Sequence, residues 1–135
     1  MKQGEEHVMT GAMLCFPASW SLEQKFMKSL VKIHVPVDEY TPDIARRVQR
    51  VFDGIKVERP MWRANYLFYN DPELFQPHKE KDRRDYDAGK PKWLRVERQT
   101  LKRLPETKAV VFAIHTYVLS QDRLEELEIS LPEDE

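Results

Sequence analysis

Two segments decide the fold: WLRVERQTLKRL (93–104) and KAVVFAIHTYVL (108–119), with only PET (105–107) between them. Both are rich in the β-branched and aromatic residues that favour strands. Pro105 cannot take part in a hydrogen-bond ladder inside a strand, so it marks the connection. The stretch 93–119 therefore predicts a long β-hairpin near the C-terminus.

Charged and apolar residues are mixed along the first of these strands. Side chains alternate between the two faces of a strand, so Leu94, Val96, Arg98 and Thr100 share one face, and Arg95, Glu97, Gln99 and Leu101 share the other. One interpretation is an edge or water-facing strand whose charges pair across the sheet. The other is a polar face lining a cavity, where Glu97 binds a cationic amine and an arginine binds a carboxylate. The spacing of the residues leaves both open.

The clearest helix lies upstream of the hairpin. Thr41-Pro42-Asp43 combines a cap, a proline in the first turn and an acidic residue at the positive end of the helix. An apolar stripe at helical spacing follows, and Gly54 supplies a stop for the helix. The stripe consists of Ile44, Val48, Val51, Phe52 and Ile55.

The remaining segments complete an α+β domain. We expect strands at 7–16, with a bend at Gly11, and at 62–69, a helix at 21–31, an extended segment at 32–37 and a solvated loop at 76–92. The order of these elements contains no βαβ alternation. It therefore predicts an antiparallel sheet with helices packed on one side.

Length and composition exclude several classes of protein. The chain has 135 residues, 22 basic and 23 acidic side chains and a net charge of −1, so we expect one domain at 1–121 and no nucleic-acid partner. No apolar run could span a membrane. The single Cys15 excludes a disulfide framework and Cys-rich metal sites, and its apolar neighbours predict a buried thiol. The segment 122–135, with seven acids against one arginine, is an acidic tail.

His34 is the histidine with the most informative surroundings, because Ile33 and Val35 flank it. A neutral imidazole there could ligate iron through one nitrogen while the other is held by the backbone or by a carboxylate. The residues alone favour a satisfied, partly buried histidine instead. The same interpretation applies to His115. No phosphate-binding glycine loop, H-E-x-x-H or C-x-x-C motif is present.

Six segments taken together carry a family resemblance. They are, in order, CFPASWSLEQK (15–25), IHVPVDEY (33–40), RPMWRANY (59–66), DPELFQP (71–77), WLRVERQTLKRLP (93–105) and AVVFAIHTYV (109–118). This ordered set resembles the haem-dependent oxidative N-demethylase-like family. The resemblance implies a PAS-like fold around a b-type haem and oxidation of a small amine such as dimethylamine with O₂ to release formaldehyde. It also implies electrons from NADPH through separate flavin and iron–sulfur reductase subunits, and a cytoplasmic protein.

Site residues follow from the same resemblance. His34 is implied as the axial haem ligand, and Glu97 as the partner of a protonated amine. Arg95 and Arg98 are implied to polarise oxygen or to hold a haem propionate, and Arg63 and Asn65 are further pocket candidates. Because the family's members are longer than this chain, we expect a domain that is incomplete at both ends. The alternative is a non-enzymatic PAS-like sensor module or an inactive fragment of the family.

Overall fold

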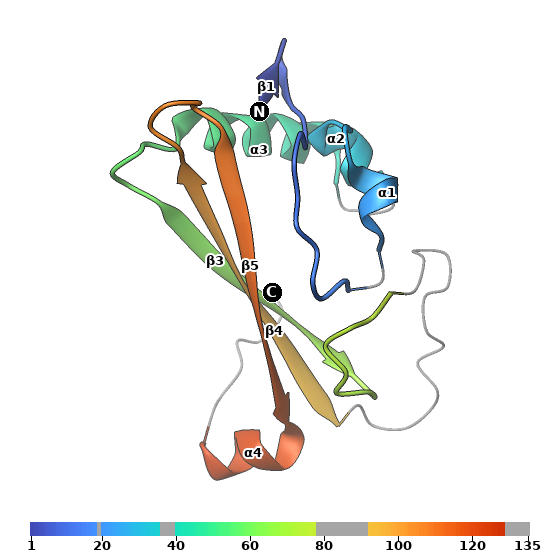
Figure 1. The fold of residues 1–135 in the computed structure, drawn as a ribbon. Coiled ribbons are helices and arrows are strands. Elements are labelled where there is room, and N and C mark those ends of the chain that lie inside the picture. The colour runs from blue at the N-terminus through green and yellow to red at the C-terminus, as the bar shows by residue number, and fades with distance from the viewer. Residues whose placement is uncertain (19, 36–39, 78–91, 129–135) are drawn as a thin grey trace.

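The computed structural model describes residues 1–18, 20–35, 40–77 and 92–128. A three-stranded antiparallel sheet runs through the molecule in the order β3-β4-β5, with bounds Met61–Tyr69, Trp93–Arg103 and Val110–Ser120 (Figure 1). β4 and β5 form the predicted hairpin, with Trp93 opposite Ser120 and Arg103 opposite Val110. Helices accompany this sheet, so the α+β class is confirmed.

Short elements precede the sheet. The strands β1 (Lys2–Gln3) and β2 (Glu6–His7) pair with each other, and the helices α1 (Leu22–Lys25), α2 (Leu30–Ile33) and α3 (Pro42–Gly54) follow. A last helix, α4 (Gln121–Glu126), opens the acidic segment after β5, and its Leu124 is buried. None of the helices in the described part of the chain has the length and hydropathy to cross a membrane.

The helix α3 has the predicted start. The Thr41 hydroxyl accepts a hydrogen bond from the Ile44 amide at 3.4 Å, and Asp43 forms ion pairs with Arg46 and Arg47 on the exposed side. At the other end, the Arg103 guanidinium of β4 donates to the carbonyls of Phe52 and Ile55. This arginine satisfies carbonyls that a helix end leaves without partners, and it attaches α3 to the sheet.

Two predictions for the N-terminal third are wrong. No strand runs along 9–16, where the predicted strand is reduced to β2 and a single bridge between Val8 and Ser29. The predicted helix 21–31 is interrupted, because Met27 has a left-handed φ of 58° and the Ser29 hydroxyl caps a new helix, α2. A left-handed residue cannot continue an α-helix.

Further expectations also need correction. Residues 32 and 33 belong to α2 rather than to an extended segment, and residues 36–39 lie outside the described part. Most of the predicted loop 76–92 also lies outside it, while Gln76 is buried at 1% exposure. Cys15 is exposed, not buried.

The sheet has an inner and an outer face. The inner face carries Arg63, Asn65 and Leu67 of β3 and the odd-numbered residues of β4; the outer face carries Trp62 and the even-numbered residues of β4. The inner face is covered in part: the Arg95 guanidinium reaches the Phe16 carbonyl and Arg103 reaches α3, whereas Leu67, Phe112 and Ile114 stay exposed. The predicted partition of the β4 side chains is thus confirmed. β4 is the central strand, so the prediction of an edge strand is wrong, while Arg98 and Lys102 on its outer face are exposed, as in a water-facing strand.

Candidate functional site

A connected row of polar side chains crosses the middle of the inner face. The Arg63 Nε donates to the Gln99 Oε1 at 2.8 Å, and the Gln99 Nε2 donates to the Glu97 Oε2 at 3.5 Å. The Glu97 Oε1 lies 3.5 Å from the Arg95 Nε. The Glu97 carboxylate therefore lies between two guanidinium groups. Arg95 is directly beside it, and the buried Gln99 amide links it to Arg63.

Burial gives this row its rigidity. Gln99 is 7% exposed and Arg95 is 3% exposed, whereas the Glu97 side chain keeps 20% of its surface open. Because Arg63 donates to one end of the Gln99 amide, the other end must present its NH₂ group to Glu97. The row therefore holds the Glu97 carboxylate in a defined place beneath a partly open surface.

Arg95 also fastens two loops to the sheet. Its Nη1 donates to the Leu74 carbonyl at 3.1 Å and its Nη2 to the Phe16 carbonyl at 3.5 Å, and its guanidinium lies 5.8 Å from the centre of the Tyr69 ring. Its Nε has no hydrogen-bond partner among the described residues, although Glu97 is near. Both terminal nitrogens of Arg95 are therefore used in hydrogen bonds that join the Leu74 and Phe16 segments to the sheet.

A small open hollow lies beside Glu97. Its volume is only about 10 Å³, which is room for about one water molecule. Asn65, which lies opposite Glu97 across the strands, is on its wall. The full lining is Asn65, Tyr66, Leu67, Tyr69, Arg95 and Glu97.

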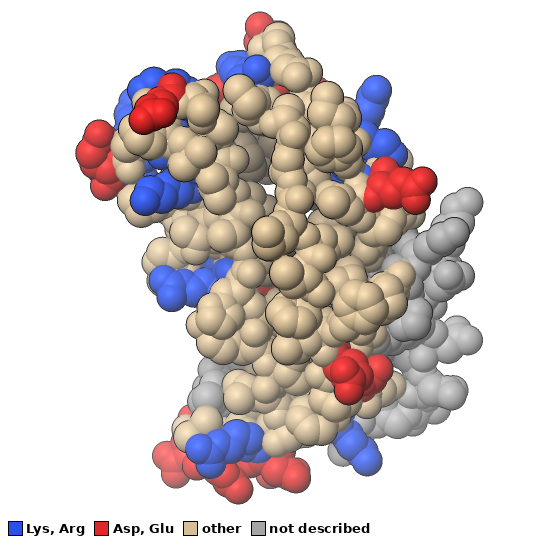
Figure 2. Space-filling view, viewed as in Figure 1, with Lys and Arg blue, Asp and Glu red and all other residues tan. Residues whose placement is uncertain are grey.

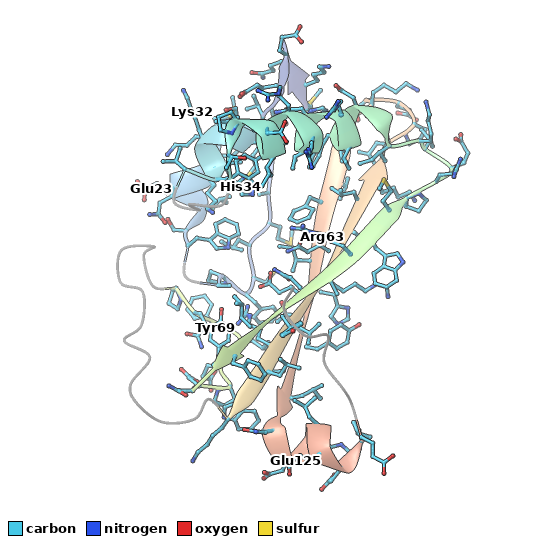
Figure 3. The ribbon with its side chains drawn as sticks, turned by 180° about the vertical axis from the view of Figure 1, so that it is seen from behind. Glu23, Lys32, His34, Arg63, Tyr69 and Glu125 are labelled. Carbon is cyan, nitrogen blue, oxygen red and sulfur yellow. The ribbon has the colours of Figure 1, made fainter. Side chains whose placement is uncertain are left out.

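His34 ends α2 on the same side of the sheet. Its Nδ1 lies 2.7 Å from the Leu30 carbonyl and its ring stacks on the Tyr40 ring with centroids 4.3 Å apart. A carbonyl oxygen only accepts, so Nδ1 carries the proton and Nε2 keeps its lone pair. None of the described residues makes a hydrogen bond to Nε2. Figure 3 places His34 and Arg63 on the same side of the sheet.

The electrostatic surroundings keep His34 neutral. Burial is the main cause that lowers the pKa of the His34 imidazole, and the positive charges of Lys25 and Arg63 lower it further. The hydrogen bond to Leu30 acts in the opposite direction. Neutral imidazole is the form that ligates a metal.

The predicted site residues divide into two groups. Arg63, Asn65, Arg95 and Glu97 lie together on the inner face, and the Arg63 charge acts on His34. Arg98 lies on the outer face, where its guanidinium sits 5.0 Å from the centre of the Trp62 ring. Alternation along β4 predicts Gln99 on the same face as Glu97, but neither the residue pattern nor the family resemblance predicts a role for it. Its polar side chain on the same face as Glu97 was the one available signal.

The donor set fits a haem. Haem iron needs one axial side chain from the protein, and the His34 imidazole, with its Nδ1 on the Leu30 carbonyl, can supply its Nε2. A macrocycle also needs apolar contacts. Figure 2 shows a broad uncharged area with charges mainly at its margins. Exposed apolar side chains of the inner face include Leu67, Phe112 and Ile114.

Comparison with protein families agrees with this fit. The family model described as "Haem-dependent oxidative N-demethylase, alpha subunit-like" matches residues 1–133, almost the whole chain. The match confirms the resemblance carried by the six segments. The chain therefore belongs to the haem-dependent oxidative N-demethylase alpha subunit-like family.

Proposed function

We propose that the chain carries a haem site for the oxidative N-demethylation of a small amine, with His34 as the axial ligand. One observation carries the proposal: His34 has its Nδ1 fixed on the Leu30 carbonyl, its Nε2 lone pair unused by the described residues, and Arg63 within electrostatic reach. This is the arrangement of metal-binding histidines, in which one nitrogen is oriented by a hydrogen bond while the other ligates.

Haem would supply the oxidation, in which O₂, two external electrons and two protons convert an N-methyl amine into the demethylated amine, formaldehyde and water. The protein would position the amine. Glu97 is the one carboxylate of the polar row, and it keeps 20% of its side-chain surface open beside a hollow with room for about one water molecule. Asn65 offers a further hydrogen-bonding group on the same wall. Electrons would come from NADPH through separate flavin and iron–sulfur subunits.

The two arginines of the inner face would have different tasks. Arg63 is exposed and commits its Nε to Gln99, so its two terminal nitrogens suit a haem propionate. Arg95 spends its terminal nitrogens on the Leu74 and Phe16 carbonyls, so its contribution near Glu97 is charge. Arg98, on the outer face, would need a different role from the one implied by the resemblance.

A haem- or ligand-binding module without turnover is the second candidate. The charge of Arg95 favours it, because a guanidinium 3.5 Å from Glu97 opposes the binding of a second cation to that carboxylate. An amine bound there as the neutral base would avoid this repulsion. The two candidates share the haem site and differ in whether an amine is consumed.

Haem titration tests the ligand assignment. Hemin is added to the purified wild-type protein and to His34→Ala, and the Soret band is recorded. His115→Ala is the matched control, because His115 is an exposed histidine stacked on Tyr117 on the outer face. We expect a Soret band in the wild type and the control and a displaced or lost band in His34→Ala. An identical band in all three proteins would reject His34 as the ligand.

Turnover separates the two candidate functions. The haem-loaded protein is incubated with dimethylamine and O₂ while ascorbate and an electron mediator supply electrons, and formaldehyde is measured. Formaldehyde that depends on the amine and falls in Glu97→Gln supports demethylation. A normal Soret band without amine-dependent formaldehyde supports the binding module.

A further inference from the structure

The outer edge of β5 is a long unpaired strand edge. β5 (Val110–Ser120) lies at one side of the three-stranded sheet, with β4 as its sole strand neighbour among the described residues (Figure 1). Eleven residues of strand are about 37 Å long. Strand edges of this length offer a row of backbone donors and acceptors to another chain.

Two hydrogen bonds at the ends of the hairpin reveal which backbone groups face outward. The Leu104 amide donates to the Ala109 carbonyl and the Gln121 amide to the Lys92 carbonyl, both at 2.8 Å. Hydrogen-bonded pairs alternate along an antiparallel ladder. The odd-numbered residues of β5 therefore bond to β4, and the even-numbered residues turn their N–H and C=O groups away. No backbone hydrogen bond joins these outward groups to another described residue at Phe112, Ile114, Thr116 and Val118.

The side chains of β5 contain none of the usual protection against edge pairing. Natural edges carry charges, prolines or bulges, whereas VVFAIHTYVLS has no Lys, Arg, Asp, Glu or Pro. Its apolar side chains are also open, with Phe112 at 47%, Ile114 at 42% and Tyr117 at 43% exposure. The edge of β3, in comparison, includes Arg63.

This edge is complementary to itself. In an antiparallel pair of two β5 strands centred on His115, the outward-facing Phe112 of one copy lies opposite Val118 of the other, and Ile114 opposite Thr116. The even-numbered residues are the ones whose free N–H and C=O groups face outward, so each of these pairs can exchange two hydrogen bonds. The same register also places the two strands side by side over their full length. No charged side chain of β5 opposes a like charge.

We propose that β5 pairs with β5 of a second copy of this chain and that the two sheets form one continuous six-stranded antiparallel sheet. The interface includes neither His34 nor Glu97, although Phe112 and Ile114 of the interface also lie on the inner face of the sheet. A single strand edge is at the small end of protein interfaces, which makes the dimer weak and concentration-dependent.

Amide hydrogen exchange followed by NMR tests the proposal at the level of single residues. Exchange is measured at low and high protein concentration, together with the mass by light scattering. We expect a dimer at high concentration and a concentration-dependent slowing at residues 112, 114, 116 and 118, while 111, 113, 115 and 117 are slow at both concentrations. A monomer with fast even-numbered amides would refute the proposal. Slow even-numbered amides in a monomer would also refute it, because another segment of the same chain would then cover the edge.

The variant Ile114→Lys provides the second test. Two copies would place lysines side by side next to the two-fold axis, and like charges in neighbouring cross-strand positions repel. We expect the dissociation constant to rise about tenfold or more. Val51→Lys on α3 is the control, because Val51 is 40% exposed and lies outside the edge. Equal weakening in both variants would contradict pairing through β5.

Discussion

The rings of His34 and Tyr40 stack with their centroids 4.3 Å apart and their planes 15° from parallel. The imidazole is thus held by a ring contact on its face and by the Leu30 carbonyl in its plane. The Tyr40 hydroxyl is buried and has no hydrogen-bond partner among the described residues, and burial raises the pKa of Tyr40. Tyr40 therefore supports His34 through its ring rather than through its hydroxyl.

Substitution of Tyr40 should separate the ring from the hydroxyl. A stacked aromatic pair contributes about 0.5–1.5 kcal/mol beyond its buried area, so Tyr40→Leu should weaken hemin binding by up to about tenfold. Tyr40→Phe should bind hemin like the wild type, and its free energy of unfolding should be unchanged or higher by about 1 kcal/mol, because a buried hydroxyl without a partner is removed. Hemin titration and urea denaturation measure both effects. Equal loss of affinity in both variants would show that the hydroxyl matters.

The stability of the fold should depend on pH through Asp53, whose carboxylate binds Lys2 of the N-terminal hairpin. The Lys2 Nζ donates to both carboxylate oxygens of Asp53 at 2.9 Å, and this hydrogen bond is the main cause that holds the pKa of Asp53 below its ordinary value of 3.8. A lowered carboxyl pKa stabilises the fold at pH above 3.8, and this stability is lost as the pH falls through the folded-state value. The wild type should thus unfold at higher urea than Asp53→Asn at pH 7, and the difference should shrink at pH 2.5. When the protein also carries Lys2→Met, the substitution Asp53→Asn should lower the urea concentration needed for unfolding at pH 7 by a smaller amount.

Arg103 should be among the most important residues for stability. Its guanidinium donates to the Ile55 and Lys108 carbonyls, both at 2.7 Å, and to the Phe52 carbonyl. Hydrogen bonds from charged groups contribute about 1.5–3 kcal/mol each and are not additive, so Arg103→Met should lower the free energy of unfolding by about 3 kcal/mol. Arg98→Met, the same change on the outer face of β4, should cost less than about 1 kcal/mol, because it removes a cation–π contact. Urea denaturation of both proteins checks this difference, and similar losses would contradict it.

Local signals explain which parts of the fold were predictable. The cap at Thr41 and the period of α3 are contained within a few residues, as are the strand propensity and the turn of the β4–β5 hairpin. The segment 9–16 has strand-like composition but lacks a strand partner, and composition alone cannot supply one. Ser29 was assigned to a helix interior, although the left-handed Met27 makes it the cap of a second helix.

The candidate site required information that the sequence does not contain. Alternation along β4 correctly separated Glu97 from Arg98. It could not reveal that Arg95 and Gln99 on the more polar of the two faces are buried, because this depends on where Phe16 and α3 meet Arg95 and Arg103. It also could not reveal that Arg63 meets Gln99, because that contact depends on the register between β3 and β4.

Gln99 should control the geometry of the Glu97 carboxylate. Gln99→Leu removes both the bond from Arg63 and the bond to Glu97, so Glu97 should lose its fixed position while the fold loses about 1–2 kcal/mol. Under the proposed function, the Soret band should persist and amine-dependent formaldehyde should fall. Thr100→Val is the control, because it is a change of similar size at the neighbouring residue, whose side chain lies on the outer face. This variant should keep both the Soret band and the formation of formaldehyde. If Gln99→Leu lost the Soret band, or if the control lost as much turnover, Gln99 would have a general structural role instead of positioning Glu97.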